Sequence, residues 1–320
     1  DSGAFTIDVG GNLNLDTDTG IIILKDGGSE FAALQNASGD LTIGAGDTGV
    51  RFNDSGALGG VDLDYLGEQR SIESKIVIGA DGLTSRVGRW AGMKTQVKMK
   101  DMESGVQYSV SNIDLETDRM VMYVGSDYAP GGYLWVFPKG DRFANIGIGI
   151  SGKHSKHKSA KKYLDEFMER EYPDAAILTT MCGGVPCAKP MKDPVKDGLM
   201  LVGDAAHQVN PMTGGGILSG MTAGAIAGEV AADAIKRNDF SAKMLSRYTD
   251  KMWKKFGKNY ERFYRIKEAI NNLDDNDLNS IADKVLAIPH NKRSLASVFK
   301  AAVFKKPTLI LDVLKVFAGV

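Results

Sequence analysis

Cysteine and histidine are scarce in this chain, which has two cysteines and four histidines among 320 residues. So few cysteines exclude a disulfide scaffold, and we expect a reducing, cytoplasmic environment. Cys182 and Cys187 flank the stretch CGGVPC, read as a loop in which they could pair, although two free thiols are the simpler interpretation. His154 and His157 lie in a lysine-rich stretch without the further ligands of a metal site. We predict no metal and a solvated surface there, with attraction of a phosphate headgroup as the alternative.

Charge imbalance and long apolar runs are also missing. The formal net charge is −1, which gives no reason to expect nucleic acid as a partner. No apolar run is long enough to cross a bilayer, and the first residues have neither the basic start nor the apolar stretch of a signal peptide. With 43% hydrophobic and 25% charged residues, the composition is typical of globular proteins, and the length allows two modest domains.

The most informative stretch is LMLVGDAAHQVNPMTGGG, residues 199–216. Leu199–Val202 is predicted as a buried strand with Asp204 just beyond its end, and the glycine triplet Gly214–Gly216 precedes a helix predicted over Ile217–Ile235. A carboxylate accepts hydrogen bonds from sugar or ribityl hydroxyls, and a helix start offers free N–H groups and a positive dipole end. The stretch therefore predicts a site for a hydroxylated, anionic cofactor.

A second stretch, KIVIGADGLTSRVGRWAG, covers residues 75–92. Ile76–Ile78 reads as a short strand, Gly79–Gly82 as a tight turn, and Ser85 as the N-cap of a following helix. Either stretch alone is compatible with an ordinary junction between a strand and a helix. Together and in this order, they favour a flavin-binding fold.

Residues 1–58 differ in composition from the rest, being rich in Gly, Asp, Asn and Thr. The sequence GNLNL at residue 11 recurs as GDLTI at residue 39, with short strands expected at Leu13–Leu15 and Leu41–Ile43, which predicts stacked β-units. Gly44–Gly49 fits the GxGxxG pattern of dinucleotide-binding loops, but the following VRFNDSGALGG cannot form the helix that such a loop requires. We reject that match and expect a pair of turns.

Residues 93–190 are predicted to form an antiparallel substrate sheet, with strands at 106–110, 120–124, 133–137 and 143–150. Tyr133, Trp135 and Phe137 are two apart and share one strand face, as do Gly147 and Gly149 on the partner strand. If the loop 138–142 sets the register, odd positions meet odd positions. This leaves a slot for a flat or chain-like apolar ligand; alternatively, the aromatics are core and the glycines relieve crowding.

The three patterns resemble the geranylgeranyl reductase family of flavoproteins, which includes the archaeal digeranylgeranylglycerophospholipid reductases. GDAAH, a proline and a glycine turn are similar to the second FAD-binding motif of this superfamily, and GADGxxSxxG to its other internal motif. YxWxFP followed by GxG, preceded by APGG, is similar to the family's own signature. The likeness covers roughly residues 59–285. In that family an N-terminal strand, glycine loop and helix bind the adenosine half of FAD; we do not find this unit and expect a truncated or fused form.

The resemblance implies an α/β (α+β) fold with four parts. These are a foreign β-repeat segment (1–58), a partial FAD-binding domain (59–92 and 191–237), an antiparallel substrate sheet (93–190) and a C-terminal helical region (238–320). It implies FAD as cofactor, an isoprenoid lipid as substrate, and NAD(P)H or ferredoxin as electron donor. The expected activity is saturation of the geranylgeranyl chains of membrane ether lipids.

The resemblance also assigns site residues. The expected cofactor-binding residues are Gly79, Ala80, Asp81, Gly82, Ser85, Gly203, Asp204, Ala205, Pro211, Gly214, Gly215, Gly216 and Ile217. The expected substrate-binding residues are Tyr133, Trp135, Phe137, Pro138, Gly147 and Gly149. His207, the only histidine inside a motif, is a candidate proton donor because the pKa of a histidine lies near neutrality; the alternative that we favour is that it orients the loop and contacts cofactor phosphate.

The region from about residue 240 is predicted to be helical, basic and amphipathic. Leu309, Ile310, Val313, Leu314 and Phe317 line one face of its last helix, near several lysines. Such a helix suits docking at a membrane surface, and packing onto the protein's own core explains the same stripe. Two alternatives to the reductase remain: an FAD-dependent monooxygenase of the aromatic hydroxylase type, and a non-catalytic fusion fragment.

Overall fold

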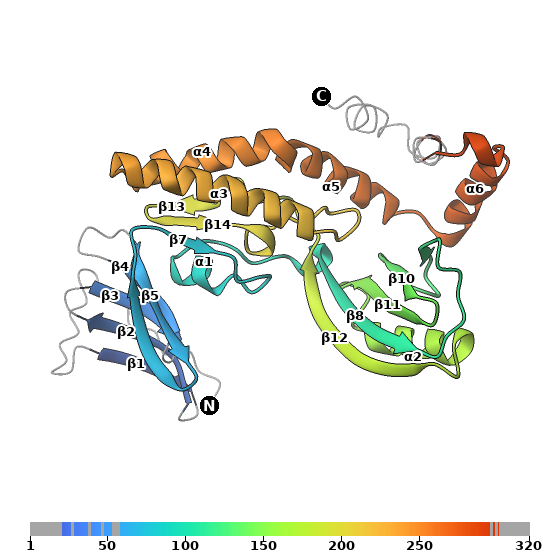
Figure 1. Ribbon diagram of the computed structural model, residues 1–320, viewed down its shortest axis with the longest axis horizontal. Coiled ribbons are helices and arrows are strands. Elements are labelled where there is room, and N and C mark those ends of the chain that lie inside the picture. The colour runs from blue at the N-terminus through green and yellow to red at the C-terminus, as the bar shows by residue number, and fades with distance from the viewer. Residues whose placement is uncertain are drawn as a thin grey trace, which may run out of the picture. The chain divides into compact units, whose positions relative to one another are not determined.

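The computed structural model describes the backbone of residues 21–26, 29–37, 40–45, 48–52, 58–294, 297 and 300, and side chains from Leu58 onward (Figure 1). The chain divides into two compact units. The first contains the described residues up to Val77 together with Trp90–Met93, and the second contains Ile78–Arg89 and the described residues from Lys94 onward. We describe each unit by itself.

The first unit is a six-stranded antiparallel sheet in which each strand pairs with the next along the chain. Its strands are β1 (Ile21–Asp26), β2 (Ser29–Ala37), β3 (Asp40–Ala45), β4 (Thr48–Phe52), β5 (Leu58–Tyr65) and β6 (Glu68–Glu73). The sheet crosses residue 58, where we expected a division, because β4 pairs with β5. The assignment of residues 1–58 to a separate domain therefore stays a prediction, while the compact unit ends at Val77.

The repeat predicted in the N-terminal segment is only partly visible. The strand expected at Leu41–Ile43 lies within β3, whereas that expected at Leu13–Leu15 lies outside the described residues. Gly44 pairs with Gly49 across the hairpin between β3 and β4. A strand, not a helix, follows the GxGxxG pattern, which agrees with its rejection as a dinucleotide loop.

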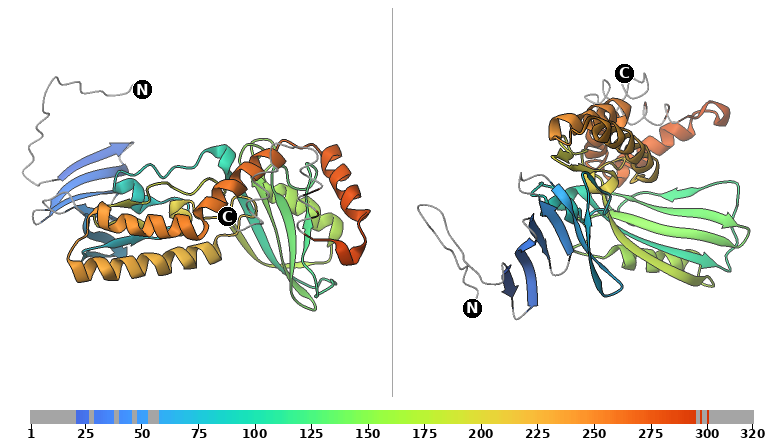
Figure 2. Two further views of the ribbon diagram at one scale, coloured as in Figure 1. Left: turned by 90° about the horizontal axis from the view of Figure 1, so that it is seen from above. Right: turned by 60° about the vertical axis from the view of Figure 1, so that its left-hand side comes forward.

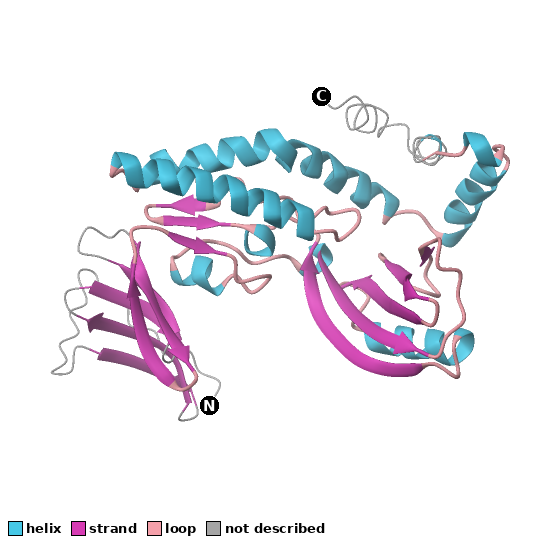
Figure 3. Cartoon of the chain, in the orientation of Figure 1, coloured by secondary structure: helices cyan, strands magenta, loops and turns pink. Residues whose placement is uncertain are grey.

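The second unit begins with a small sheet of order β13–β14–β7, formed by β7 (Val77–Gly79), β13 (Val195–Lys196) and β14 (Leu199–Leu201). All three residues of β14 are buried, as its continuous apolar sequence predicts. Two helices, α3 (Ile217–Arg237) and α4 (Ala242–Met252), pack against each other and run along this sheet (Figures 1 and 3). The sheet ends and the start of α3 thereby lie close together.

The larger sheet of this unit has the order β12–β8–β11–β10–β9, with antiparallel neighbours throughout. Its strands are β8 (Met102–Ser111), β9 (Val121–Tyr123), β10 (Tyr133–Gly140), β11 (Phe143–Ser151) and β12 (Ala176–Pro186). Four of the five match predicted segments. β12 was not predicted, and the residues CGGVP, read as part of a loop, form the end of this strand, with Cys187 just beyond it; both cysteines are free, Cys182 exposed and Cys187 buried.

One face of the larger sheet carries the core, covered by α2 (Ala160–Glu171) (Figure 2). The buried strand residues on this face have even numbers, since the side-chain period of a strand is two. They are Val106, Tyr108, Val110, Leu134, Val136, Ala144, Ile146, Ile148 and Ile150. The odd-numbered residues of β8, β10 and β11, which include the predicted aromatic row, therefore face away from α2; on β9 the parity is reversed, and Tyr123 packs on the core.

The chain continues through helices after α4, as predicted for the C-terminal region. A π-helical turn at Trp253–Gly257 leads into α5 (Lys258–Ile270), and α6 (Asp275–Leu286) follows. The apolar stripe from Leu309 to Phe317 lies outside the described residues. Within the described part of the chain, no helix combines the length and the apolar character that a membrane span requires.

Candidate functional site

The end of β14 and the start of α3 enclose a cavity of about 510 Å³. We call it the Asp204 cavity; its lining residues are Ala80, Gly82, Val185, Val202, Gly203, Asp204, Gly214, Gly216, Ile217, Gly220 and Met221. The loop and the helix approach each other closely here: a Cβ on Gly216 would lie 3.1 Å from Asp204 Oδ1, and the carboxylate would have to shift. The carboxylate and the first turn of α3 thus share one wall of the cavity.

Asp204 lies in the short 3-10 helix Gly203–Ala206, which starts at Gly203 with a left-handed φ of 64°. Burial raises the pKa of the Asp204 carboxyl, and the nearby His207 opposes that shift. The first N–H groups of α3 have no partners within the helix. A carboxylate acceptor beside free N–H donors fits a ligand that carries both hydroxyl and anionic groups.

Seven of the predicted cofactor-binding residues line this cavity. The other six do not line it and have structural contacts of other kinds. Gly79 lets β7 pack closely on β14, since a Cβ there would lie 2.6 Å from Leu201 Cδ2. Asp81 accepts a hydrogen bond from the Val87 backbone N–H at 3.0 Å. The prediction of Ser85 as N-cap is wrong: its buried hydroxyl has no hydrogen-bond partner among the described residues, and Asp81 caps α1 (Arg86–Trp90) instead.

Three further predicted cofactor residues lie in the 3-10 helix or in the loop that joins it to α3. Ala205 is fully buried. Gly215 accepts a hydrogen bond from the Asn210 N–H at 3.0 Å, which closes the turn. Pro211 lines a neighbouring cavity rather than this one. A direct cofactor contact for these three stays a prediction.

The neighbouring cavity, of about 330 Å³, lies on the face of the larger sheet that carries Tyr133 and Trp135, and we call it the Tyr133 cavity. The sheet, the loop before α3 and the end of α5 line it with Glu103, Gly105, Met122, Val124, Gly131, Gly132, Tyr133, Trp135, Gly149, Val185, Cys187, Pro211, Met212, Thr213, Gly214, Lys267, Ile270 and Asn271. Val185 and Gly214 also line the Asp204 cavity, so the two cavities adjoin.

The predicted register of β10 and β11 is confirmed: Tyr133 pairs with Gly149 and Trp135 with Gly147. The two glycines differ: Gly147 relieves crowding, and Gly149 leaves open space. The Trp135 ring covers Gly147, where a Cβ would lie 2.3 Å from Trp135 Cζ2, so this glycine relieves crowding. Gly149 stays open to the cavity.

The aromatic row is held by its own contacts. Trp135 Nε1 donates a hydrogen bond to Gln107 at 3.1 Å, and the ring centroid of Phe137 lies 6.0 Å from that of Trp135. The Tyr133 hydroxyl donates to the backbone oxygen of Thr213, one residue before Gly214. Tyr133, Trp135 and Gly149 line the cavity, whereas the predicted substrate residues Phe137, Pro138 and Gly147 do not.

His207 lines neither cavity. Its Nε2 lies 2.8 Å from the backbone oxygen of Thr95, and its backbone adopts a left-handed φ of 57°. Burial lowers the pKa of the imidazole, and hydrogen bonds to the backbone of Thr95 and Lys189 oppose that shift. This geometry supports the loop-orienting role over that of a proton donor.

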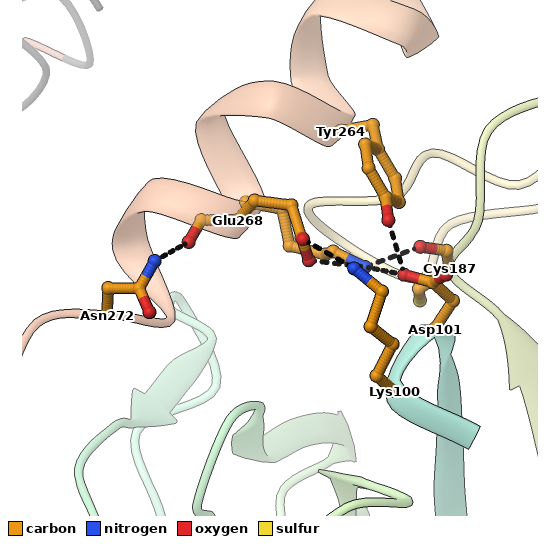
Figure 4. Close-up of polar contacts among 7 residues, drawn as sticks. Lys100, Asp101, Cys187, Tyr264, Glu268 and Asn272 are labelled. Atoms are coloured by element: carbon orange, nitrogen blue, oxygen red, sulfur yellow. Dashed lines mark hydrogen bonds and ion pairs between the residues drawn. The ribbon is translucent and has the colours of Figure 1, made fainter. Parts of the chain in front are cut away.

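Two charged residues of the Tyr133 cavity, Lys267 and Glu103, were not predicted from the sequence. Lys267 is 6% exposed; its ammonium donates to Cys187 O at 2.7 Å and to Asp101 Oδ1 at 3.2 Å. Tyr264 also donates to Asp101, at 2.8 Å (Figure 4). Glu103, two residues after Asp101, has a buried Oε2 without a hydrogen-bond partner among the described residues, and burial raises its pKa to about 7.

The sequence indicates Glu103 and Lys267 only weakly. The strand prediction began at Val106, so Glu103 fell outside it, although its odd number places it on the cavity face of β8. Lys267 interrupts the apolar face of α5, which indicates a buried charge only once that face is known to be covered.

Comparisons with known proteins agree with the geometry. The family model described as "Geranylgeranyl reductase catalytic domain" matches residues 101–185. Digeranylgeranylglycerophospholipid reductase 1 of Methanococcoides burtonii is 43% identical over 267 residues, which cover 83% of this chain and 65% of the relative. The chain therefore spans just under two thirds of that relative's length.

Two further comparisons cover more of their partners. Digeranylgeranylglycerophospholipid reductase of Methanosarcina acetivorans is 37% identical, with 90% of this chain and 71% of the relative covered, so this likeness reaches into residues 1–58. The crystal structure of a geranylgeranyl bacteriochlorophyll reductase-like protein from Thermoplasma acidophilum matches with a TM-score of 0.75 and 33% identity, over 87% of this chain and 69% of the other. The chain belongs to the geranylgeranyl reductase family.

Proposed function

We propose that this chain forms the substrate-binding part, and part of the flavin-binding part, of an FAD-dependent reductase that saturates geranylgeranyl chains of membrane ether lipids. The observation that carries the proposal is the shared wall of the two cavities, at Val185 and Gly214. One cavity offers a carboxylate and a helix start, and the other offers an aromatic and glycine surface. A cofactor in the first would thus adjoin an apolar chain in the second.

The residues of the Asp204 cavity fit the cofactor. Gly216 leaves the space in which the Asp204 carboxylate meets the start of α3, and any larger residue would crowd it. Asp204 would accept hydrogen bonds from hydroxyl groups, and the N–H groups from Gly216 onward would face anionic or electron-rich atoms. Bound FAD would supply a hydride when reduced.

The residues of the Tyr133 cavity suit a hydrocarbon chain. Tyr133 and Trp135 give it a flat apolar wall, Gly105 and Gly149 leave its floor without side chains, and Ile270 closes it from α5. Such a surface gains free energy by removing apolar area from water and excludes water from the reacting carbons. The hydrogen bond from Tyr133 to Thr213 connects this wall to the loop before α3.

Contact with the membrane surface is part of the proposal. Met122 and Val124 line the Tyr133 cavity and are 54% and 57% exposed, and Met120 next to them is 68% exposed. Exposed apolar side chains at a cavity rim suit a protein that takes its substrate from a lipid layer. The protein would then act at the membrane periphery.

The test uses the protein in its natural length, purified with FAD and reduced with NADPH, with ferredoxin or chemically. Incubated with a geranylgeranyl ether lipid, it should yield products heavier by two hydrogens for each double bond, as measured by mass spectrometry. NADPH-dependent oxygen consumption without chain saturation would instead favour the monooxygenase. A colourless protein that binds no flavin and alters no lipid would favour the non-catalytic fragment.

A further inference from the structure

Glu103 is a carboxyl group in a largely apolar cavity, in which Lys267 is the other charged lining residue. It lies on β8 and faces the Tyr133 cavity, and its Oε2 is buried without a hydrogen-bond partner among the described residues. A buried, unpaired polar atom costs free energy that most proteins avoid. An ionised carboxylate would cost more still, so the group is better tolerated in its neutral, protonated form.

Two glycines lie beside this carboxyl. A Cβ on Gly132 would lie 2.0 Å from the Gly149 backbone oxygen and 3.1 Å from Glu103 Oε2, and a Cβ on Gly149 would lie 4.0 Å from Oε2, an ordinary contact distance. Both glycines line the same cavity as Glu103. A larger residue at Gly132 would clash with the backbone of Gly149 and crowd the carboxyl, whereas Gly149 leaves the carboxyl open to the cavity.

The surroundings of Glu103 favour its neutral form. Burial raises the pKa of Glu103 to about 7, and only Lys267 opposes that shift. The ammonium of Lys267 is already bonded to Asp101 and to the Cys187 backbone. The other titratable groups that face the cavity, Tyr133 and Cys187, both have a raised pKa and are neutral near pH 7.

We propose that Glu103 is the catalytic acid that protonates the isoprenoid double bond. This inference rests on the proposed reductase function. Bound reduced flavin would supply a hydride, with its two electrons, to one alkene carbon as the π bond opens. Glu103 would give its proton to the other carbon. The products would be a saturated C–C bond, an oxidised flavin and the Glu103 carboxylate, which would regain a proton from solvent.

The neighbouring groups are less suited to this step. The Tyr133 hydroxyl already donates its proton to Thr213 O. The pKa of the Cys187 thiol is raised to about 12, far from the neutral range that favours proton donation. His207 lies outside the cavity and contacts the backbone of Thr95.

The first experiment compares Glu103→Gln with the wild type, each in natural length and loaded with FAD. The amide keeps the shape of the side chain and has no acidic proton. We expect kcat for chain reduction to fall on the order of 100-fold, the usual contribution of a general acid. Binding of a saturated lipid and the flavin absorbance should be unchanged, and kcat of the wild type, but not of the variant, should decline above pH 7. Glu169→Gln, an exposed change on α2, is the matched control and should leave kcat unchanged.

A second measurement is independent of activity. Difference infrared spectra of the chain without cofactor should contain the C=O band of a protonated carboxylic acid that disappears near pH 7, and this band should be absent in Glu103→Gln. Glu103→Asp, which retains an acid on a shorter stem, should recover part of kcat if the glutamine variant folds poorly.

The outcomes separate this inference from the proposed function. Chain reduction by the wild type and by Glu103→Gln at equal rates would overturn the role of Glu103 and leave the reductase standing. A titrating band that stays in Glu103→Gln would overturn the claim that Glu103 carries the proton. A flavin-loaded wild type that reduces no isoprenoid chain would overturn the reductase, and the assignment of Glu103 with it.

Discussion

The indole ring of Trp135 lies across the backbone of Gly147, so closely that a Cβ on Gly147 would be 2.3 Å from Cζ2 of the ring. The two residues are direct partners in the antiparallel pair β10–β11. Trp135 thereby stays flat against the sheet, between Tyr133 and Phe137. The shape of the Tyr133 cavity depends on this contact, because an upright Trp135 would occupy it.

Gly147→Ala should therefore lower stability and disturb the cavity. We expect a loss of about 1–3 kcal/mol, the usual cost of inserting a methyl group into a packed site, measured by chemical denaturation. Intrinsic tryptophan fluorescence should change as the ring is displaced. Gly183→Ala is the matched control, since its Cβ would meet no atom within 4 Å; equal losses in the two variants would contradict the contact.

Asp204→Asn should weaken flavin binding. A hydrogen bond to a charged acceptor contributes about 1.5–3 kcal/mol, so we expect the Kd for FAD to rise roughly 10- to 100-fold. Fluorescence quenching of added FAD measures it. Asp193→Asn, an exposed change before β13, should leave the Kd unchanged. The assignment of Asp204 fails if both variants bind FAD as tightly as the wild type.

The two lysine contacts at the start of β8 should differ in their contribution to stability. In the pair Lys267–Asp101 both side chains are less than a tenth exposed, whereas Lys100–Glu268 is exposed at 49% and 38%. Lys267→Met leaves the Asp101 carboxylate buried without its cation, and we expect a loss of about 3–5 kcal/mol in the free energy of unfolding. Lys100→Met should cost less than about 1 kcal/mol. Urea titrations followed by circular dichroism measure both losses. An equally small loss in the two variants would contradict the prediction.

The two cysteines should react with a thiol reagent at very different rates. Cys182 is exposed and Cys187 is buried, and burial raises the pKa of Cys187 to about 12. Because the thiolate is the reactive form, roughly one Cys187 in 10⁴ is reactive at pH 8. In the native protein one thiol should react quickly, and Cys182→Ser should abolish that fast phase. A fast phase that remains in this variant would show that Cys187 is accessible.

Glu103 should make stability depend on pH. Its pKa is raised from 4.5 to about 7 in the folded chain, so the folded state binds more protons than the unfolded state between these values. Stability attributable to this group therefore falls as the pH rises through that window. We expect the Tm to drop less between pH 5 and pH 8 in Glu103→Gln than in the wild type. Identical pH profiles would contradict a neutral Glu103.

Short-range patterns predicted much of the second unit. The two-residue period of YLWVF and IGIGI predicted the register of β10 and β11, and the order of strand, Asp204, glycine turn and helix was read directly from the motif. Both depend on residues that are near in sequence. Strand β12 was missed because its second half is interrupted by Gly183 and Gly184, and it is defined by pairing with β8 across the unit.

Long-range contacts explain the other differences. Glu103 and Lys267 line one cavity although they are far apart in sequence, so neither stands out until α5 is placed against β8. Asp81 rather than Ser85 caps α1, because the chain at Ser85 adopts a left-handed φ of 41° and buries the hydroxyl. A local pattern marks a polar residue near a helix start but does not say which of two side chains reaches the free N–H.

Val185 and Gly214 line both cavities. A Cβ on Gly214, whose φ is 67°, would lie 3.8 Å from Val185 Cγ1. A substitution at either position would alter two chambers at once. Variants selected here for longer or bulkier hydrocarbons should therefore show shifted redox potentials as well, so specificity and electron transfer would have to evolve together.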